Sequence, residues 1–159
     1  MKKIFLLFVL ISSFAFSQMP NIEKVWLNDS KPYVGNLDQA SVKVRISVSE
    51  QDKKNDQEYF VAGNTLVDGS NLTKFEGKMS ITKYRDGKRR STVYGSYELA
   101  EEPKGTHSGL FTGKFVYNFK WNRKSQQIEA EFIQFTGNWK SYDGTMNFRT
   151  SWSNNQKKN

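Results

Sequence analysis

Few residues in this chain could do acid–base or nucleophilic chemistry. The one histidine, His107, lies in a polar segment between apolar runs, and there is no cysteine. Glu129 and Glu131 are two residues apart, so on an extended strand they would point the same way, as a catalytic carboxylate pair requires. They alternate with apolar residues, however, which predicts a solvent-facing position. No serine elbow, nucleotide loop or metal-ligand spacing occurs. We therefore expect no enzymatic activity, no metal and no cofactor.

A second group of residues could bind a ligand rather than react with one. In this group a glycine has a large apolar residue two positions before it and another two positions after it. The unit occurs at Phe75, Gly77 and Met79, at Val93, Gly95 and Tyr97, at Phe111, Gly113 and Phe115, and at Phe135, Gly137 and Trp139, with a looser copy around Gly63. Because side chains alternate across a strand, each glycine shares the inward face with its large neighbours.

Glycine inside a strand costs about 0.5–1 kcal/mol relative to alanine, so its repeated use needs a reason. One interpretation is that the glycines let coiled strands bend around a small barrel while aromatic rings fill the space. The other is that they leave an aromatic-walled hollow for one small hydrophobic or aromatic ligand. The second interpretation gives the candidate binding residues as Phe75, Gly77, Tyr97, Phe111, Gly113, Phe115, Tyr117 and Trp139.

The densest charge lies in a segment expected to be a hairpin tip. Its five cations are Lys83, Arg85, Lys88, Arg89 and Arg90, around the single Asp86. Closely spaced cations could bind a phosphate or sulfate polymer, or they could form a solvated turn that discourages strand pairing. In an exported protein the polymer would be an acidic glycan or another envelope polyanion, and not nucleic acid.

The elements that position these groups are predicted to be strands, since alternation of period two dominates from Ala40 onward and no sustained helical period occurs. The clearest alternation places Val42, Val44, Ile46 and Val48 on one face. Further strands are expected near residues 22–27, 58–67, 73–84, 91–99, 109–121, 127–139 and 145–152, about eight in all. A change of phase within 127–139 predicts a β-bulge near Phe132 and Ile133.

The connections predict the order of these strands. Asp68-Gly69, Asp86-Gly87 and Asp143-Gly144 are pairs that favour tight hairpins. Hairpins in succession give antiparallel strands in meander order, which predicts a small up-and-down β-barrel because closure removes exposed edges. A β-sandwich is the alternative fold.

The segment from Phe111 to Phe115, with its Thr-Gly-x-aromatic pattern, resembles strands of avidin and lipocalin-type (calycin) barrels. The resemblance covers such short stretches only. The glycine–x–tryptophan opening of those families is absent, and Val25-Trp26-Leu27 matches it in part. The resemblance implies the barrel architecture, and no ligand or binding residue follows from it.

The first residues predict export. Lys2 and Lys3 precede an apolar run from Ile4 to Phe16, which is too short to span a bilayer, and small residues precede Gln18. We expect a signal peptide over 1–17 cleaved after Ser17, a single barrel domain over 18–152 and a disordered tail over 153–159. The product would be secreted or periplasmic, with no transmembrane segment and, lacking cysteine, no lipid anchor.

Composition agrees with one exported domain of ordinary size that folds without disulfides. The formal net charge of the sequence is +8, which suits solubility as well as contact with polyanions. The sequence thus predicts an exported, non-enzymatic barrel that binds a small hydrophobic or aromatic molecule or contacts another envelope component. The alternative is a surface module that binds acidic glycan through the basic hairpin tip.

Overall fold

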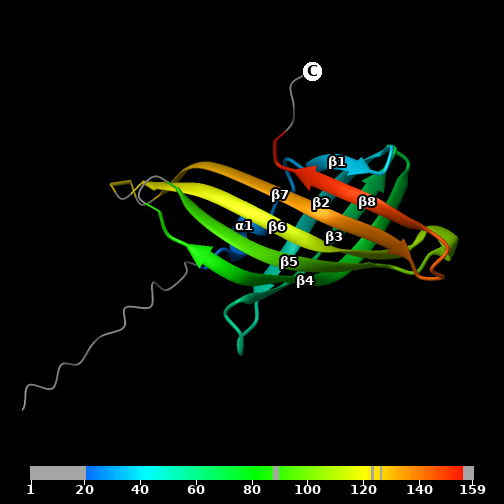
Figure 1. The fold of residues 1–159 in the computed structure, drawn as a ribbon, viewed down its shortest axis with the longest axis horizontal. Coiled ribbons are helices and arrows are strands. Elements are labelled where there is room, and N and C mark those ends of the chain that lie inside the picture. Colours follow the sequence, from blue (N-terminus) through cyan, green and yellow to red (C-terminus); the bar gives the residue numbers. More distant parts are fainter. Residues whose placement is uncertain (1–20, 88–89, 123, 126, 156–159) are drawn as a thin grey trace, which may run out of the picture.

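Eight antiparallel strands follow one another in chain order around a closed barrel in the computed structural model (Figure 1). The structure describes residues 21–87, 90–122, 124–125 and 127–155. The strands are β1 (Tyr33–Leu37), β2 (Ala40–Gln51), β3 (Glu58–Val67), β4 (Asn71–Arg85), β5 (Ser91–Glu101), β6 (Gly109–Asn122), β7 (Gln127–Ser141) and β8 (Asn147–Ser153). Pairing of β1 with β8 closes the ring. The predicted meander barrel is confirmed, while the predicted leader and residues 156–159 lie outside the described part.

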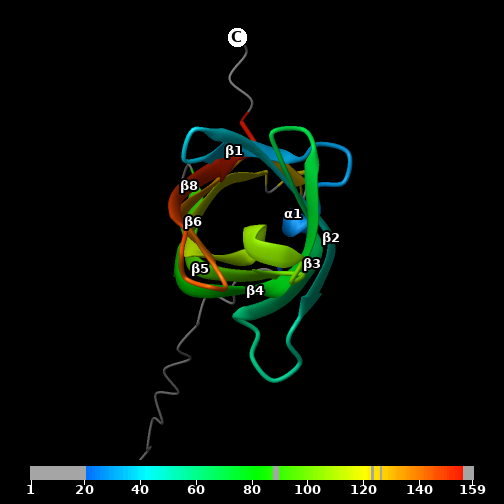
Figure 2. The same cartoon turned by 90° about the vertical axis from the view of Figure 1, so that its right-hand side faces the viewer.

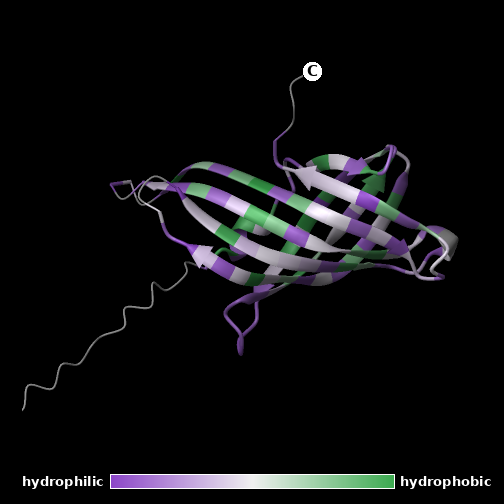
Figure 3. Ribbon diagram, in the orientation of Figure 1, coloured by the Kyte–Doolittle hydropathy of each residue, from purple (hydrophilic) through white to green (hydrophobic). Residues whose placement is uncertain are grey.

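Alternating hydropathy along the strands places the apolar side chains inside the barrel (Figure 3). The centre of the interior is aromatic. Phe135 and Trp152 stack with ring centroids 3.7 Å apart, and Trp26 meets Phe115 edge to face at 4.9 Å. Such pairs contribute about 0.5–1.5 kcal/mol each beyond the area they bury. The core is therefore a packed set of rings contributed by strands far apart in sequence.

The first predicted strand, 22–27, is wrong: Glu23–Trp26 form a short helix, α1. Ile22, Val25 and Trp26 have the i, i+3, i+4 spacing of a helical face, and Trp26 is fully buried among the barrel rings. Viewed along the barrel, α1 lies within the ring of strands (Figure 2). The eighth strand is instead β1, whose central glycine and asparagine weaken its alternating pattern.

Two predictions about strand phase are also wrong. The pairing of β2 with β3 shifts between Ile46 and Val48, and this shift leaves Val48 exposed rather than inward with Val42. The bulge predicted near Phe132 and Ile133 is absent, because β6 and β7 pair without interruption there. The shift in that pair lies instead between Lys120 and Trp121, where Glu129 is the extra residue. A bulge is set by the partner strand as much as by its own sequence.

The mid-strand glycines are required by close approach of neighbouring strands. Gly113 and Gly137 pair directly across β6 and β7. A Cβ at Gly137 would lie 2.0 Å from the carbonyl oxygen of Thr112 and 2.8 Å from the Tyr97 hydroxyl. A Cβ at Gly95 would lie 2.2 Å from the ring of Phe115. Backbone and aromatic rings thus occupy the space beside these glycines, as the first interpretation of the repeated unit describes.

Replacing Gly137 with alanine should therefore destabilise the barrel. The new methyl group has to displace the main chain of β6 and the ring of Tyr97, and overpacking of this kind costs about 1–3 kcal/mol or more. Ser151→Thr is the matched control, since it adds one methyl group on the exposed face of β8 and should stay within about 0.5 kcal/mol of the parent. Urea denaturation measures both, and equal stability of the two variants would contradict this account of the glycines.

Candidate functional site

The aromatic residues predicted to bind a ligand all lie inside the barrel, with exposed fractions of 4% or less. Tyr97 covers Gly113, and its ring packs edge to face on Phe135. Gly77 faces the main chain of β5, with the carbonyl oxygen of Glu98 2.0 Å from a Cβ placed there. Phe75 borders a pocket beside Pro103 and Tyr142, and Trp139 borders a pocket at the barrel end.

This pocket, called here the end pocket, lies where the β1–β2, β3–β4, β5–β6 and β7–β8 connections meet. Its volume of about 430 Å³ is in the range of small-molecule sites. The apolar wall consists of Leu37, Ala40, Val67, Trp139, Met146 and Phe148, and the polar lining of Asp38, Gln39, Asn71, Thr73, Glu101 and His107. The short 3₁₀ helix η1 (Gly105–His107) of the β5–β6 connection lies in front of the barrel opening in Figure 2.

Tight turns bring these distant segments together. In the β3–β4 turn both Asp68 and Gly69 have positive φ, at 47° and 72°, as the predicted tight hairpin requires. In the β1–β2 turn Asp38 has a φ of 52°, a conformation that aspartate tolerates better than most residues. The short turns keep Asp38 and the first residues of β2 and β4 at the rim of the pocket.

An aromatic pair forms part of the apolar wall. Trp139 of β7 and Phe148 of β8 are paired in register, and their rings are nearly parallel, with centroids 5.9 Å apart and an interplanar angle of 6°. Trp139 is buried, whereas Phe148 is half-buried. The pair presents an apolar surface on which a ligand ring could pack.

The last inward residue of β5, Glu101, is a carboxylate buried at the base of the end pocket, with 4% of its surface exposed. It accepts hydrogen bonds from the Thr65 hydroxyl at 2.7 Å, the Trp139 indole nitrogen at 2.8 Å and the Gly109 amide at 3.1 Å. Burial raises the pKa of Glu101, and these donors offset part of that rise. A carboxylate offers about four acceptor positions, so one remains open.

The rim of the pocket is held by further hydrogen bonds. Tyr142 donates its hydroxyl to the main-chain oxygen of Glu101 at 2.5 Å and its amide to the carbonyl of Ser108 at 3.1 Å. Ser108 in turn accepts from the amide of Lys104 at 2.7 Å. These contacts join the β5–β6 connection, which carries the exposed His107, to the β7–β8 turn. The ring of Tyr142 is exposed.

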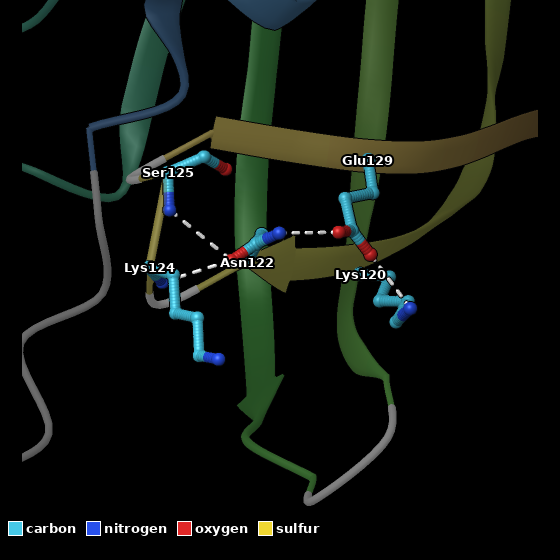
Figure 4. A network of polar contacts seen from close by, with 5 residues as sticks. All are labelled: Lys120, Asn122, Lys124, Ser125 and Glu129. Carbon is cyan, nitrogen blue, oxygen red and sulfur yellow. Dashed lines mark hydrogen bonds and ion pairs between the residues drawn. The ribbon is translucent and has the colours of Figure 1, made fainter.

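The two glutamates considered as a catalytic pair have separate partners at the opposite end of the barrel. Glu129 forms an ion pair with Lys120 at 2.6 Å and accepts a hydrogen bond from Asn122, which also accepts from the amides of Lys124 and Ser125 (Figure 4). These two partners lower the pKa of Glu129. Glu131 accepts from the buried Tyr117 hydroxyl at 3.1 Å. Both glutamates are exposed, as the sequence predicts.

The basic hairpin tip lies at that same opposite end, between β4 and β5. Lys83, Arg85 and Arg90 are exposed there, and none of them forms an ion pair within the described residues. Lys88 and Arg89 fall outside the described part. Binding of an acidic glycan through this segment stays a prediction.

Comparisons with protein-family models, with curated proteins and with solved structures find no match for this chain. Within the described ranges, no helix is long and apolar enough to cross a bilayer. The same residues contain no group of three or more histidine, cysteine, aspartate or glutamate side chains placed to hold a metal ion. The candidate site therefore has to be judged on its own geometry.

Trp139 is among the binding residues predicted from the sequence, whereas Glu101 and Phe148 are not. The sequence does indicate an inward position for Glu101. Val93, Tyr97 and Leu99 alternate on the inward face of β5, and the same alternation continued by two residues places Glu101 on that face. The strand expected over 91–99 ends two residues short of Glu101, which the structure places at the end of β5.

Glu101→Gln should change the pH dependence of stability. Glutamine can accept from Trp139 and Gly109 with its oxygen and donate to Thr65 with its amide, so the fold is retained. Because the folded-state pKa of Glu101 is raised above 4.5, the stability this group contributes is complete below about pH 4.5 and is lost as the pH rises through the folded-state pKa. From pH 4 to 8 the variant should therefore gain stability relative to the parent. Denaturation at a series of pH values measures the free energy of unfolding of the variant and of the parent. If the variant's advantage over the parent stays constant or falls between pH 4 and 8, the raised pKa of Glu101 is contradicted.

Proposed function

We propose that this protein is an exported, non-enzymatic binding protein that takes a small, mainly apolar or aromatic molecule into the end of its barrel interior. The observation that carries the proposal is the end pocket, where an aromatic wall faces a few polar groups on a rigid strand framework. This combination is typical of small-molecule sites. Export is supported by the leader-like residues 1–17.

The location at the barrel end follows from the packing of the centre. Around Gly113 and Gly137 the Tyr97 ring and the neighbouring main chains occupy the space, and Trp152 stacks on Phe135. A ligand in the centre would have to displace several buried rings, whereas the end pocket offers volume without such a rearrangement. Trp139, from the originally predicted set, would contact the ligand there.

The apolar wall alone gives modest affinity. A ring the size of phenylalanine buries about 150 Å², and at about 25 cal/mol per Å² this contributes about 4 kcal/mol. That free energy corresponds to a Kd near 1 mM before the costs of association. The polar groups of the end pocket must therefore add both affinity and selectivity.

Filling the pocket should abolish binding. Ala40 starts β2 and lines the end pocket, so Ala40→Phe would occupy ligand space, whereas Ala130→Phe adds the same group on the exposed face of β7. Small phenyl, naphthyl and indole compounds with neutral, acidic and basic groups should include members that raise the melting temperature of the parent and of Ala130→Phe. The same compounds should not stabilise Ala40→Phe.

Thermal unfolding with and without each compound gives the comparison. If no compound stabilises the parent at millimolar concentration, or if Ala40→Phe responds as the parent does, ligand binding in the end pocket is wrong.

A further inference from the structure

We propose that the end pocket selects organic cations, meaning an amine or quaternary ammonium group carried on a small apolar body. The inference rests on the proposed ligand binding and specifies the polar group of the ligand. It is drawn from the charge of the pocket lining, the surroundings of one buried carboxylate and the aromatic wall.

The charge of the pocket lining is opposite to that of the whole chain. Lysine and arginine outnumber aspartate and glutamate by 24 to 16 in the sequence, yet the lining contains Asp38 and Glu101 and no lysine or arginine. His107 is the one basic side chain among the lining residues. A concave site whose walls carry one sign of charge concentrates ligands of the opposite sign.

Glu101 has no counter-charge among the residues that the structure describes. Its three hydrogen-bond partners are the neutral groups of Thr65, Gly109 and Trp139. The ion pairs within the described residues join Lys104 to Glu102 and Lys120 to Glu129. A buried carboxylate without a cation is costly, and a ligand ammonium would provide the missing charge. The raised pKa of Glu101 reflects this burial.

The carboxylate is positioned to accept such a group. The Oε2 atom already takes two hydrogen bonds, from Trp139 and Gly109, whereas Oε1 takes one from Thr65. The open acceptor position is therefore on Oε1. The bond from Trp139 also joins the carboxylate to a residue of the aromatic wall, so we expect one ligand to place its ammonium at Oε1 and its apolar body on the wall.

The aromatic wall adds to the preference for a cation. Trp139 and Phe148, whose rings are parallel, both line the end pocket, and aromatic π-faces attract ammonium groups. An anionic ligand would instead meet Glu101 at the base and Asp38 at the rim. The same residues thus favour the cation and oppose the anion, which is how binding sites achieve specificity.

Three compounds that share a phenylalkyl body test the proposal: 3-phenylpropylamine, 3-phenylpropanol and 3-phenylpropionate. Calorimetry at neutral pH and low salt should show the amine binding about tenfold or more tighter than the alcohol, with the acid weakest. Glu101→Gln should weaken amine binding about tenfold and leave alcohol binding within about threefold. Glu98→Gln removes the same charge from the exposed face of β5, and it should leave all three affinities within about twofold.

The outcomes separate the two proposals. If the alcohol or the acid binds as tightly as the amine, or if Glu101→Gln and Glu98→Gln weaken the amine equally, cation selection is wrong while ligand binding in the end pocket stands. If none of the three binds, cation selection is also overturned. Binding that Ala40→Phe does not prevent would overturn the pocket itself.

Discussion

Closure of eight short-linked strands into a narrow barrel is the constraint on which the structure depends. The strands approach so closely that a Cβ at Gly137 would overlap the main chain of β6, and the ring of Tyr97 takes the space that two paired glycines leave. Trp26 from α1 and Trp152 from β8 complete a fully buried aromatic centre. Because the rings pack at the centre, the space available to a ligand is found where the strands end and the connections begin.

The second feature that determines the barrel end is one charged group in this apolar interior. Glu101 joins β3, β5 and β7 and the start of β6 through its hydrogen bonds, so it contributes to the geometry of the barrel end. The same position gives the end pocket its negative character in a chain that is otherwise basic. Buried ionised groups are weak evidence for stability alone, and the proposed ligand ammonium would supply the counter-charge and give the arrangement a function.

The sequence predicted the fold well because alternation and Asp-Gly turns are local signals. Prediction from the sequence failed for features that a neighbouring strand determines. The exposure of Val48 and the bulge at Glu129 depend on the register with β3 and β6. Prediction also failed at α1, where three apolar residues fit a helical face as well as a strand. The candidate site was harder to predict than the fold, because four connections that are distant in sequence form the end pocket. Trp139 was found through its glycine unit, whereas Phe148 belongs to no recognisable motif.

The most direct test of the central claim, that the centre is filled and the ligand space lies at one end, is an NMR titration of ¹⁵N-labelled protein. The ligand is the one that calorimetry finds to bind most tightly. The indole N–H signals of the four tryptophans can be assigned by single Trp→Phe replacements. The account predicts a shift of the Trp139 signal, whose N–H is bonded to Glu101, with the Trp26 and Trp152 signals unmoved. Shifts at Trp26 and Trp152 with Trp139 unchanged would place the ligand in the barrel centre and contradict it.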